Sequence, residues 1–161
     1  MGDGLRPDVE LVVTDAGSAD ATRAMQAYFD ELADRFGFDP GDALSDAVVL
    51  MNPPNGVFVL ARRSGGVVGC GGVQVVDEHT AEIKRMWISR DVRGLGLGRL
   101  LLTRLENEAR GFGRQRVVLD TNGVLHEAIA MYRSCGYADI DRYNDNPFAE
   151  HWFAKDLGQR A

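Results

Sequence analysis

The stretch from Ala81 to Gly98, which reads AEIKRMWISRDVRGLGLG, constrains the fold of this chain more than any other. An alternating, strand-like segment leads into three glycines at every second position, and the leucine-rich sequence RLLLTRLENEAR follows at once. The pattern predicts a strand, a tight turn and an amphipathic helix that begins at the turn. The first N–H groups of a helix have no partner within the helix, and the helix dipole is positive there. Because glycine lets a bulky anion approach the backbone, the stretch predicts an anion-binding site.

Basic residues gather around this turn although the chain has a net charge of −6. Between Lys84 and Arg116 there are nine Lys and Arg residues but only three Asp and Glu residues. Arg93 and Arg99 flank the glycines, and we expect them to contact phosphate. The acidic balance of the whole chain lacks the basic footprint that nucleic-acid binding needs, so we expect no nucleic acid partner.

Composition is that of an ordinary globular protein, with 161 residues, 45% of them hydrophobic and 26% charged. We expect one domain over residues 1–161. No apolar run reaches the length of a membrane helix and no signal-peptide pattern begins the chain, so we expect a cytoplasmic protein without a membrane partner. Cys70, Cys135 and three scattered histidines show no metal-ligand spacing, so we expect no bound metal. On the helix after the turn, Arg104 and Arg110 are expected to pair with Glu106 and Glu108.

The rest of the pattern predicts early helices, three consecutive antiparallel strands and a final β-α-β-α-β run. Helices are expected at about 18–36, 42–50, 98–111 and 126–135, and strands at about 9–13, 57–62, 67–76, 80–88, 116–121, 137–142 and 151–157. Strand 116–121 is reached through a helix and should run parallel to strand 80–88. Gly69, Gly71 and Gly72 indicate a bulge or a close backbone approach. The fold class is α/β (α+β), a mixed and mostly antiparallel sheet of about six to seven strands with about four helices.

Two familiar phosphate motifs fit the turn poorly. A P-loop would place Lys and then Ser or Thr after Gly98, where this chain has Arg99 and Leu100, so ATP hydrolysis is disfavoured. In the dinucleotide fingerprint the third glycine stands one residue later than Gly98, and the motif belongs to an early β-α-β unit. Asp120 could imitate the ribose-binding carboxylate of that fingerprint, so a nicotinamide enzyme remains an alternative.

The sequence Arg93-Gly94-Leu95-Gly96-Leu97-Gly98 resembles the Arg/Gln-x-x-Gly-x-Gly/Ala signature of the GNAT superfamily of N-acetyltransferases. The strand EIKRMWI, the LLL helix, the strand VVLDT and the segment HEAIAMYRSCGY stand in the order of that family, and the resemblance covers about residues 57–157. It implies a single GNAT domain in which strands 80–88 and 116–121 diverge in a V. It also implies that acetyl-CoA is the co-substrate.

The resemblance implies which residues hold this co-substrate. The backbone of Met86, Trp87 and Ile88 would contact the pantetheine arm and polarise the acetyl carbonyl. Main-chain amides of the turn would hold the pyrophosphate, and Asn122 would make a later contact. The turn comprises Arg93, Gly94, Leu95, Gly96, Leu97, Gly98 and Arg99. Leu125 stands where many members carry Asn, which puts a side-chain contact there in doubt.

Catalytic and acceptor-binding candidates follow. Alternation puts Glu82, Lys84, Met86 and Ile88 on one face of the strand, with Ile83, Arg85 and Trp87 on the other. Glu82 resembles the family's base, acting directly or through water, but a cross-strand partner of a basic residue would look the same. Tyr132 resembles the tyrosine that protonates the leaving thiolate, although its helical spacing also suits a core aromatic. For the acceptor we expect Phe36, Asn144, Asp145 and Asn146, of which the last three also suit a turn.

The predicted activity is direct transfer of an acetyl group from acetyl-CoA to a primary amine of a small molecule, an amino acid or a protein, within a ternary complex. The amine must be neutral to attack, so a base is needed. Two alternatives stay open, a non-catalytic acyl-CoA-binding regulatory module and the nicotinamide enzyme. The resemblance also implies a homodimer, since dimers are common in the family.

Overall fold

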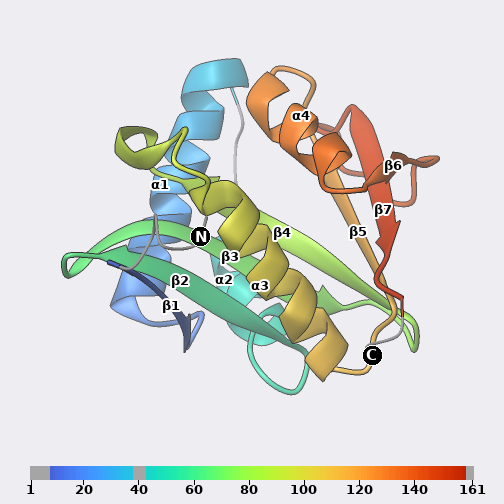
Figure 1. The fold of residues 1–161 in the computed structure, drawn as a ribbon, viewed down its shortest axis with the longest axis horizontal. Coiled ribbons are helices and arrows are strands. Elements are labelled where there is room, and N and C mark those ends of the chain that lie inside the picture. Colours follow the sequence, from blue (N-terminus) through green and yellow to red (C-terminus); the bar gives the residue numbers. More distant parts are fainter. Residues whose placement is uncertain (1–7, 38–42, 159–161) are drawn as a thin grey trace.

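The computed structural model describes residues 8–37 and 43–158 of the chain (Figure 1). In chain order the elements are β1 (Val9–Thr14), α1 (Ala19–Phe36), α2 (Ala43–Leu50), β2 (Gly56–Arg63), β3 (Gly66–Val75), β4 (Thr80–Ile88), η2 (Arg90–Val92), α3 (Leu97–Gly111), β5 (Arg116–Thr121), α4 (His126–Ser134), β6 (Ala138–Asp139) and β7 (His151–Asp156). The mixed fold class is therefore confirmed. The strand expected at 137–142 is much shorter, because only two of its residues pair with β7.

The strands form one sheet in the order β1-β2-β3-β4-β5-β7-β6. All neighbours are antiparallel except β4 and β5, which run parallel as predicted from the helix between them. The parallel pairing covers only Thr80–Glu82 of β4 and Arg116–Val118 of β5. Beyond these residues the two strands separate, and Figure 1 shows them diverging towards α1 and α4. The V-shaped splay is thus present in the middle of the sheet.

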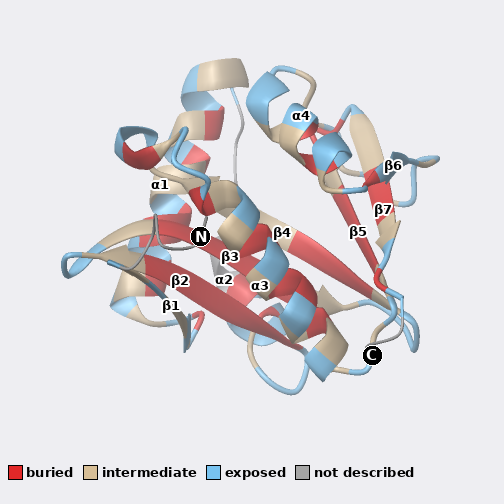
Figure 2. Cartoon of the chain, viewed as in Figure 1, coloured by how far each residue is buried: buried red, intermediate tan, exposed pale blue. Residues whose placement is uncertain are grey.

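Helices cover both faces of the sheet. α3 and α4 pack on one face, where Leu101, Leu105 and Ile129 join buried residues of the central strands. α1 and α2 pack on the other face, around Phe29 and Phe58. Figure 1 shows α3 crossing the front of the sheet with α1 and α2 behind it, and Figure 2 shows the buried residues concentrated in the central strands. The splay therefore opens between two helical layers.

A β-bulge in β4 corrects the expected alternation of its side chains. Cys70 lies opposite Trp87 but Gly72 lies opposite Lys84, so β4 carries one extra residue between these pairs. Arg85 lies in this extra stretch with a φ of 59°, in the left-handed region that few non-glycine residues occupy. The bulge reverses the order of the faces, since an added residue shifts a pattern with period two.

The expected grouping of Glu82 and Lys84 with Met86 and Ile88 is consequently wrong. Before the bulge, Ala81 and Ile83 face the α3 layer, and after it Met86 and Ile88 do so. Trp87 packs on the α1 side. By alternation with Ile83, Glu82 and Lys84 also face the α1 side.

The glycines of β3 make the close approaches that the sequence indicated. A Cβ at Gly71 would lie 2.6 Å from Leu105 Cδ1, and one at Gly72 would lie 2.0 Å from Met51 Sδ. These positions let helices approach the sheet from both sides. Cys70 between them is buried, and burial raises the pKa of its thiol, as expected for a small core residue.

Two features are absent from the part of the chain that the structure describes. No helix in this part is both long and apolar enough to cross a bilayer. No group of three or more His, Cys, Asp or Glu side chains lies close enough together to hold a metal ion there.

Candidate active site

The glycine turn has the geometry of an anion site. Gly94 and Gly96 have φ values of 83° and 82°, which favour glycine, and Gly96 is the N-cap of α3. No side chain caps this helix end, so the first-turn amides are not engaged by a capping residue. A Cβ at Gly98 would lie 2.9 Å from Met131 Sδ, and the absence of a side chain there lets α4 approach the turn.

The two arginines beside the turn have partners within the protein. Arg93 donates from Nε to the Ile88 carbonyl at 2.9 Å and pairs with Glu31 of α1 at 2.5 Å. Arg99 donates to Ser134 Oγ at 2.6 Å and to Cys135 Sγ at 3.4 Å, both at the end of α4. Arg93 therefore ties the turn to α1, while Arg99 joins α3 to α4 through neutral groups.

A cavity of about 260 Å³ extends from the turn into the splay. Its walls come from α1, the end of β4, the turn with the start of α3, and α4. The residues that line it are Tyr28, Glu31, Leu32, Arg35, Met86, Trp87, Ile88, Val92, Arg93, Gly94, Gly96, Leu97, Gly98, Arg99, Leu125, Glu127, Ala128, Met131 and Tyr132. The structure thus brings together most of the residues expected to hold the co-substrate. Two of them lie outside these walls: Leu95 is 39% exposed, and Asn122 donates to the Phe148 carbonyl at 2.7 Å.

An ion pair between α1 and α4 spans this cavity. Arg35 Nη1 lies 2.6 Å from Glu127 Oε1 and 3.5 Å from Glu31 Oε2. The Arg35 hydrogen bond lowers the pKa of Glu127. Both partners line the cavity, so the pair connects its two helical walls.

Tyr132 of α4 lies where the cavity meets the diverging strands. It is 7% exposed, and its hydroxyl oxygen lies 4.0 Å from Met86 Sδ. Its ring packs against Tyr137 and Phe153, so the residue is both a core aromatic and a cavity wall. Burial raises the pKa of Tyr132, which keeps the hydroxyl protonated at neutral pH and able to donate a proton.

Glu82 is buried at 5% exposure on the α1 side of the sheet. It accepts hydrogen bonds from Tyr143 at 2.6 Å and from its cross-strand partner Gln74 at 3.0 Å, and Lys84 Nζ lies 3.8 Å away. Glu82 does not line the 260 Å³ cavity. Its polar partners come from β3, from β4 and from the segment before β7, so the carboxylate is held in one place.

A second cavity of about 110 Å³ adjoins the first on the α1 side of the splay. Tyr28, Phe29, Ile83, Lys84, Arg85, Met86, Leu119, Asp120, Thr121, Leu125, Ala128, Tyr132 and Asn146 line it. Of the four acceptor residues expected from the sequence, only Asn146 is in this wall. Asn144 contacts it through Asp120, Asp145 is exposed, and the Phe36 ring packs 5.9 Å from that of Phe148.

Several polar residues of this second wall, among them Tyr28, Arg85 and Asp120, were not predicted as site residues from the sequence. Tyr28 falls within the helix predicted at about 18–36, Arg85 was grouped with Ile83 on one face of its strand, and Asp120 was considered only as a ribose ligand. The position of Asp120 offered a signal, because ligands of α/β sheets bind beyond the carboxyl ends of parallel strands. The sequence gives no signal for the position of Arg85, because no pattern in it marks the bulge.

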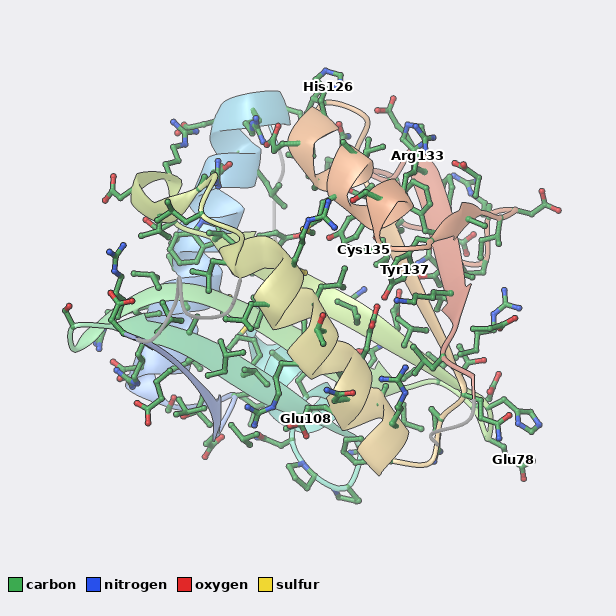
Figure 3. All side chains as sticks on the ribbon, viewed as in Figure 1. Glu78, Glu108, His126, Arg133, Cys135 and Tyr137 are labelled. Carbon is green, nitrogen blue, oxygen red and sulfur yellow. The ribbon has the colours of Figure 1, made fainter. Side chains whose placement is uncertain are left out.

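No histidine side chain lines either of the two cavities described above. His79 and His126 are exposed, and Figure 3 shows His126 at the outer end of α4 pointing away from the molecule. His151 stacks on Phe153 at 6.0 Å. None of the three histidines lines either cavity, so the titratable groups available within the described walls are carboxylates, tyrosines and basic side chains.

Comparisons with known proteins agree with this geometry. The model of the acetyltransferase (GNAT) family matches residues 21–137. An uncharacterised N-acetyltransferase of Schizosaccharomyces pombe is 31% identical over 130 residues, which span 76% of this chain and 77% of that protein. An IAA acetyltransferase of Azospirillum brasilense is 45% identical over 83 residues, but these span only 51% of this chain and 54% of that protein.

A solved structure of a GNAT-family acetyltransferase of Staphylococcus aureus shares the fold. Its TM-score is 0.82 at 16% identity, and the match covers 93% of this chain and 99% of that one. The family model spans most of this chain, including the turn, the splay and α4. The chain therefore belongs to the acetyltransferase (GNAT) family.

Proposed function

We propose that this protein transfers an acetyl group directly from acetyl-CoA to a primary amine within a ternary complex. The observation that carries the proposal is the 260 Å³ cavity, whose walls include both the uncapped start of α3 and Tyr132. A thioester whose diphosphate lies at the turn would place its acyl end beside Met86 and Tyr132. The proposed setting is the cytoplasm, and a homodimer is the assembly that family resemblance suggests.

The residues in the walls suit this co-substrate. Main-chain amides at Gly94–Gly98 can hold a diphosphate without a metal or a Walker lysine. Beyond Glu82 the edge of β4 is no longer paired with β5, so its backbone can pair with the amides of a pantetheine arm. Trp87 and Leu97 add apolar surface around that arm.

The proposed reaction forms a C–N bond and breaks the thioester C–S bond. The neutral amine attacks the carbonyl carbon, and backbone N–H groups near Met86 stabilise the negative charge on oxygen. Glu82 accepts the amine proton through water, because it does not line either cavity. Tyr132 donates a proton to the departing sulfur, so the products are an N-acetylated amine and free CoA.

The test is release of free thiol from acetyl-CoA across a panel of primary amines, with Tyr132→Phe compared with the native protein. We expect Tyr132→Phe to lower kcat by about 100-fold, the usual loss for one general acid, and to leave the Kd for acetyl-CoA unchanged. Tyr137→Phe is the matched control, because Tyr137 contacts the Tyr132 ring but lines neither cavity. It should keep kcat within about twofold.

Two outcomes would contradict the proposal. Equal kcat values for Tyr132→Phe and Tyr137→Phe would remove Tyr132 from the chemistry. Tight binding of acetyl-CoA without thiol release by any amine would favour the non-catalytic acyl-CoA-binding module instead.

A further inference from the structure

The segment between β6 and β7 places a tyrosine hydroxyl on the proposed base. Tyr143 Oη donates a hydrogen bond to Glu82 Oε2 at 2.6 Å. Glu82 is 5% exposed and Tyr143 is 37% exposed, so the tyrosine side chain runs from the surface to a buried carboxylate. Tyr143 lines neither cavity, so any part that it takes in the reaction passes through Glu82.

Polar side chains anchor the segment that carries Tyr143. Asn144 Nδ2 donates to Asp120 Oδ2 at 2.5 Å, and Asn144 Oδ1 accepts from Trp152 Nε1 at 2.9 Å. Asn146 Nδ2 donates to Asp120 Oδ1 at 3.2 Å. Asp120 belongs to β5 and Trp152 to β7, so the segment is attached to two strands of the sheet. These contacts keep the Tyr143 hydroxyl on Glu82 although the segment is neither helix nor strand.

The direction of the Tyr143 hydrogen bond favours the ionised form of Glu82. Burial and the negative charge of Glu82 raise the pKa of Tyr143, so the hydroxyl keeps its proton and remains the donor. A donor to a carboxylate stabilises the charged form relative to the protonated form. A base must be unprotonated to accept a proton, so this hydrogen bond extends the pH range in which Glu82 can act towards acid.

Glu82 has two other partners that do not depend on Tyr143. Gln74 Nε2, on the facing strand, donates to Glu82 Oε1 at 3.0 Å. Lys84 Nζ lies 3.8 Å from Glu82 Oε2 and is the one cation within 4.0 Å of it in the part of the chain that the structure describes. Removal of the Tyr143 hydroxyl leaves both contacts in place. The carboxylate should therefore keep its orientation and lose only a donor that stabilises its charge.

Two further charged side chains lie on the same face of the sheet. Val118 of β5 is the register partner of Glu82, and Arg116 and Asp120 stand two residues before and after Val118. Alternation puts all three on one face of β5. Their charges are the same in the native protein and in Tyr143→Phe, so a difference in pH dependence between these two proteins reports the lost hydroxyl.

We propose that Tyr143 is a positioning residue of the reaction, which holds Glu82 ionised as the group that receives the amine proton. The proton leaves the amine nitrogen for a water molecule, which passes one of its own protons to the Glu82 carboxylate. This inference rests on the proposed function and adds to it a residue that lines neither cavity. It gives the segment before β7 a part in the proton transfer.

The experiment compares the pH profile of kcat in the native protein and in Tyr143→Phe by thiol release from acetyl-CoA. The amines are glycine, lysine, 2-aminoethanol, 1,4-diaminobutane and a lysine-containing peptide, and the profile uses whichever of them the native protein acetylates fastest. The ratio of the two kcat values at each pH cancels the ionisation of the amine, which both proteins share.

Loss of the donor should move the acid limb of the profile up by about one pH unit. The kcat of Tyr143→Phe should therefore be about tenfold below the native value on the acid side and within about twofold of it on the alkaline side. The KM for acetyl-CoA should not change. In a Glu82→Gln background, Tyr143→Phe should add no pH-dependent loss, because its partner is gone.

Tyr137→Phe is the matched control. Tyr137 also donates from its hydroxyl to a buried glutamate, Glu106, whose Oε2 lies 2.8 Å away on the α3 side of the sheet. The control therefore removes the same atom and the same kind of hydrogen bond from a carboxylate outside the site. Its kcat, relative to the native value, should stay level across the pH range.

The outcomes separate this inference from the proposed function. A kcat ratio for Tyr143→Phe that stays level with pH would overturn the role of Tyr143, while thiol release would leave the acetyltransferase activity standing. The same acid-side loss in Tyr137→Phe, or in Tyr143→Phe on the Glu82→Gln background, would also overturn it, because the effect would not pass through Glu82. No thiol release with any of the amines would overturn both proposals.

Discussion

At the scale of single residues, the ring of Tyr132 packs in the core while its hydroxyl is the proposed proton donor. Its ring is fixed by Tyr137 and Phe153, while its hydroxyl reaches the point where the two cavities meet. Burial raises the pKa of this hydroxyl, and the charges of Tyr28 and Asp120 act in the same direction. A general acid at this position should therefore keep its proton through the range in which amine substrates become neutral.

This leads to a prediction for the pH dependence of kcat. An ordinary tyrosine loses its proton near a pKa of about 10. The raised pKa of Tyr132 should leave kcat level between about pH 8 and pH 10 once the amine is neutral. A fall in kcat with an apparent pKa below about 10 that is absent from Tyr132→Phe would contradict a protonated Tyr132.

Residues also show where sequence patterns stop being informative. The glycines of the turn were predictable because a helix start and a close approach both require them. Helical spacing predicted only that Tyr132 packs in the core, and its place in the site followed from the family resemblance. The bulge at Arg85 was not predictable, because strand alternation contains no mark of an added residue. Asp120 and Arg85 line the same cavity only because the fold brings their two strands together.

At the scale of elements, buried polar contacts join α3 to the strands beyond the splay. Glu106 of α3 is 5% exposed, accepts a hydrogen bond from Tyr137 at 2.8 Å and pairs with Lys155 of β7 at 3.1 Å. The predicted pairing of Glu106 with a neighbouring arginine of its helix is thus replaced by a contact across the fold. Arg104 pairs with Glu108 instead, at 2.8 Å.

Two glutamates of the same helix then form a matched test of stability. Glu106 is buried and Lys155 is half-buried, so Glu106→Gln removes the charged partner of Lys155 where water screens little, and the free energy of unfolding should fall by about 2 to 4 kcal/mol. Glu108 lies on the outer side of α3, in Figure 3 at the opposite side of the helix from Tyr137, and Glu108→Gln should cost at most about 0.5 kcal/mol. Urea unfolding of both variants measures the difference. Equal losses would show that Glu106 is no more than a surface ion pair.

At the scale of the whole molecule, the parallel pair β4 and β5 organises the function. Their short pairing opens the sheet, α1 and α4 line the opening, and the uncapped start of α3 lies at its entrance. The order of strands and helices was predictable from periodicity and turn residues. The depth of the splay was not, because it depends on where inter-strand pairing ends.

The central claim is that the glycine turn holds the diphosphate of acetyl-CoA, and calorimetric measurement of its Kd tests this directly. Gly96 and Gly113 have φ values of 82° and 79°, and an added Cβ at either would meet nothing within 4 Å. Changing either to alanine should therefore cost about 1 kcal/mol of stability through backbone strain alone. Only Gly96 lies at the turn, so Gly96→Ala should raise the Kd by at least about tenfold while Gly113→Ala leaves it unchanged. Equal Kd values for the two variants would contradict the account.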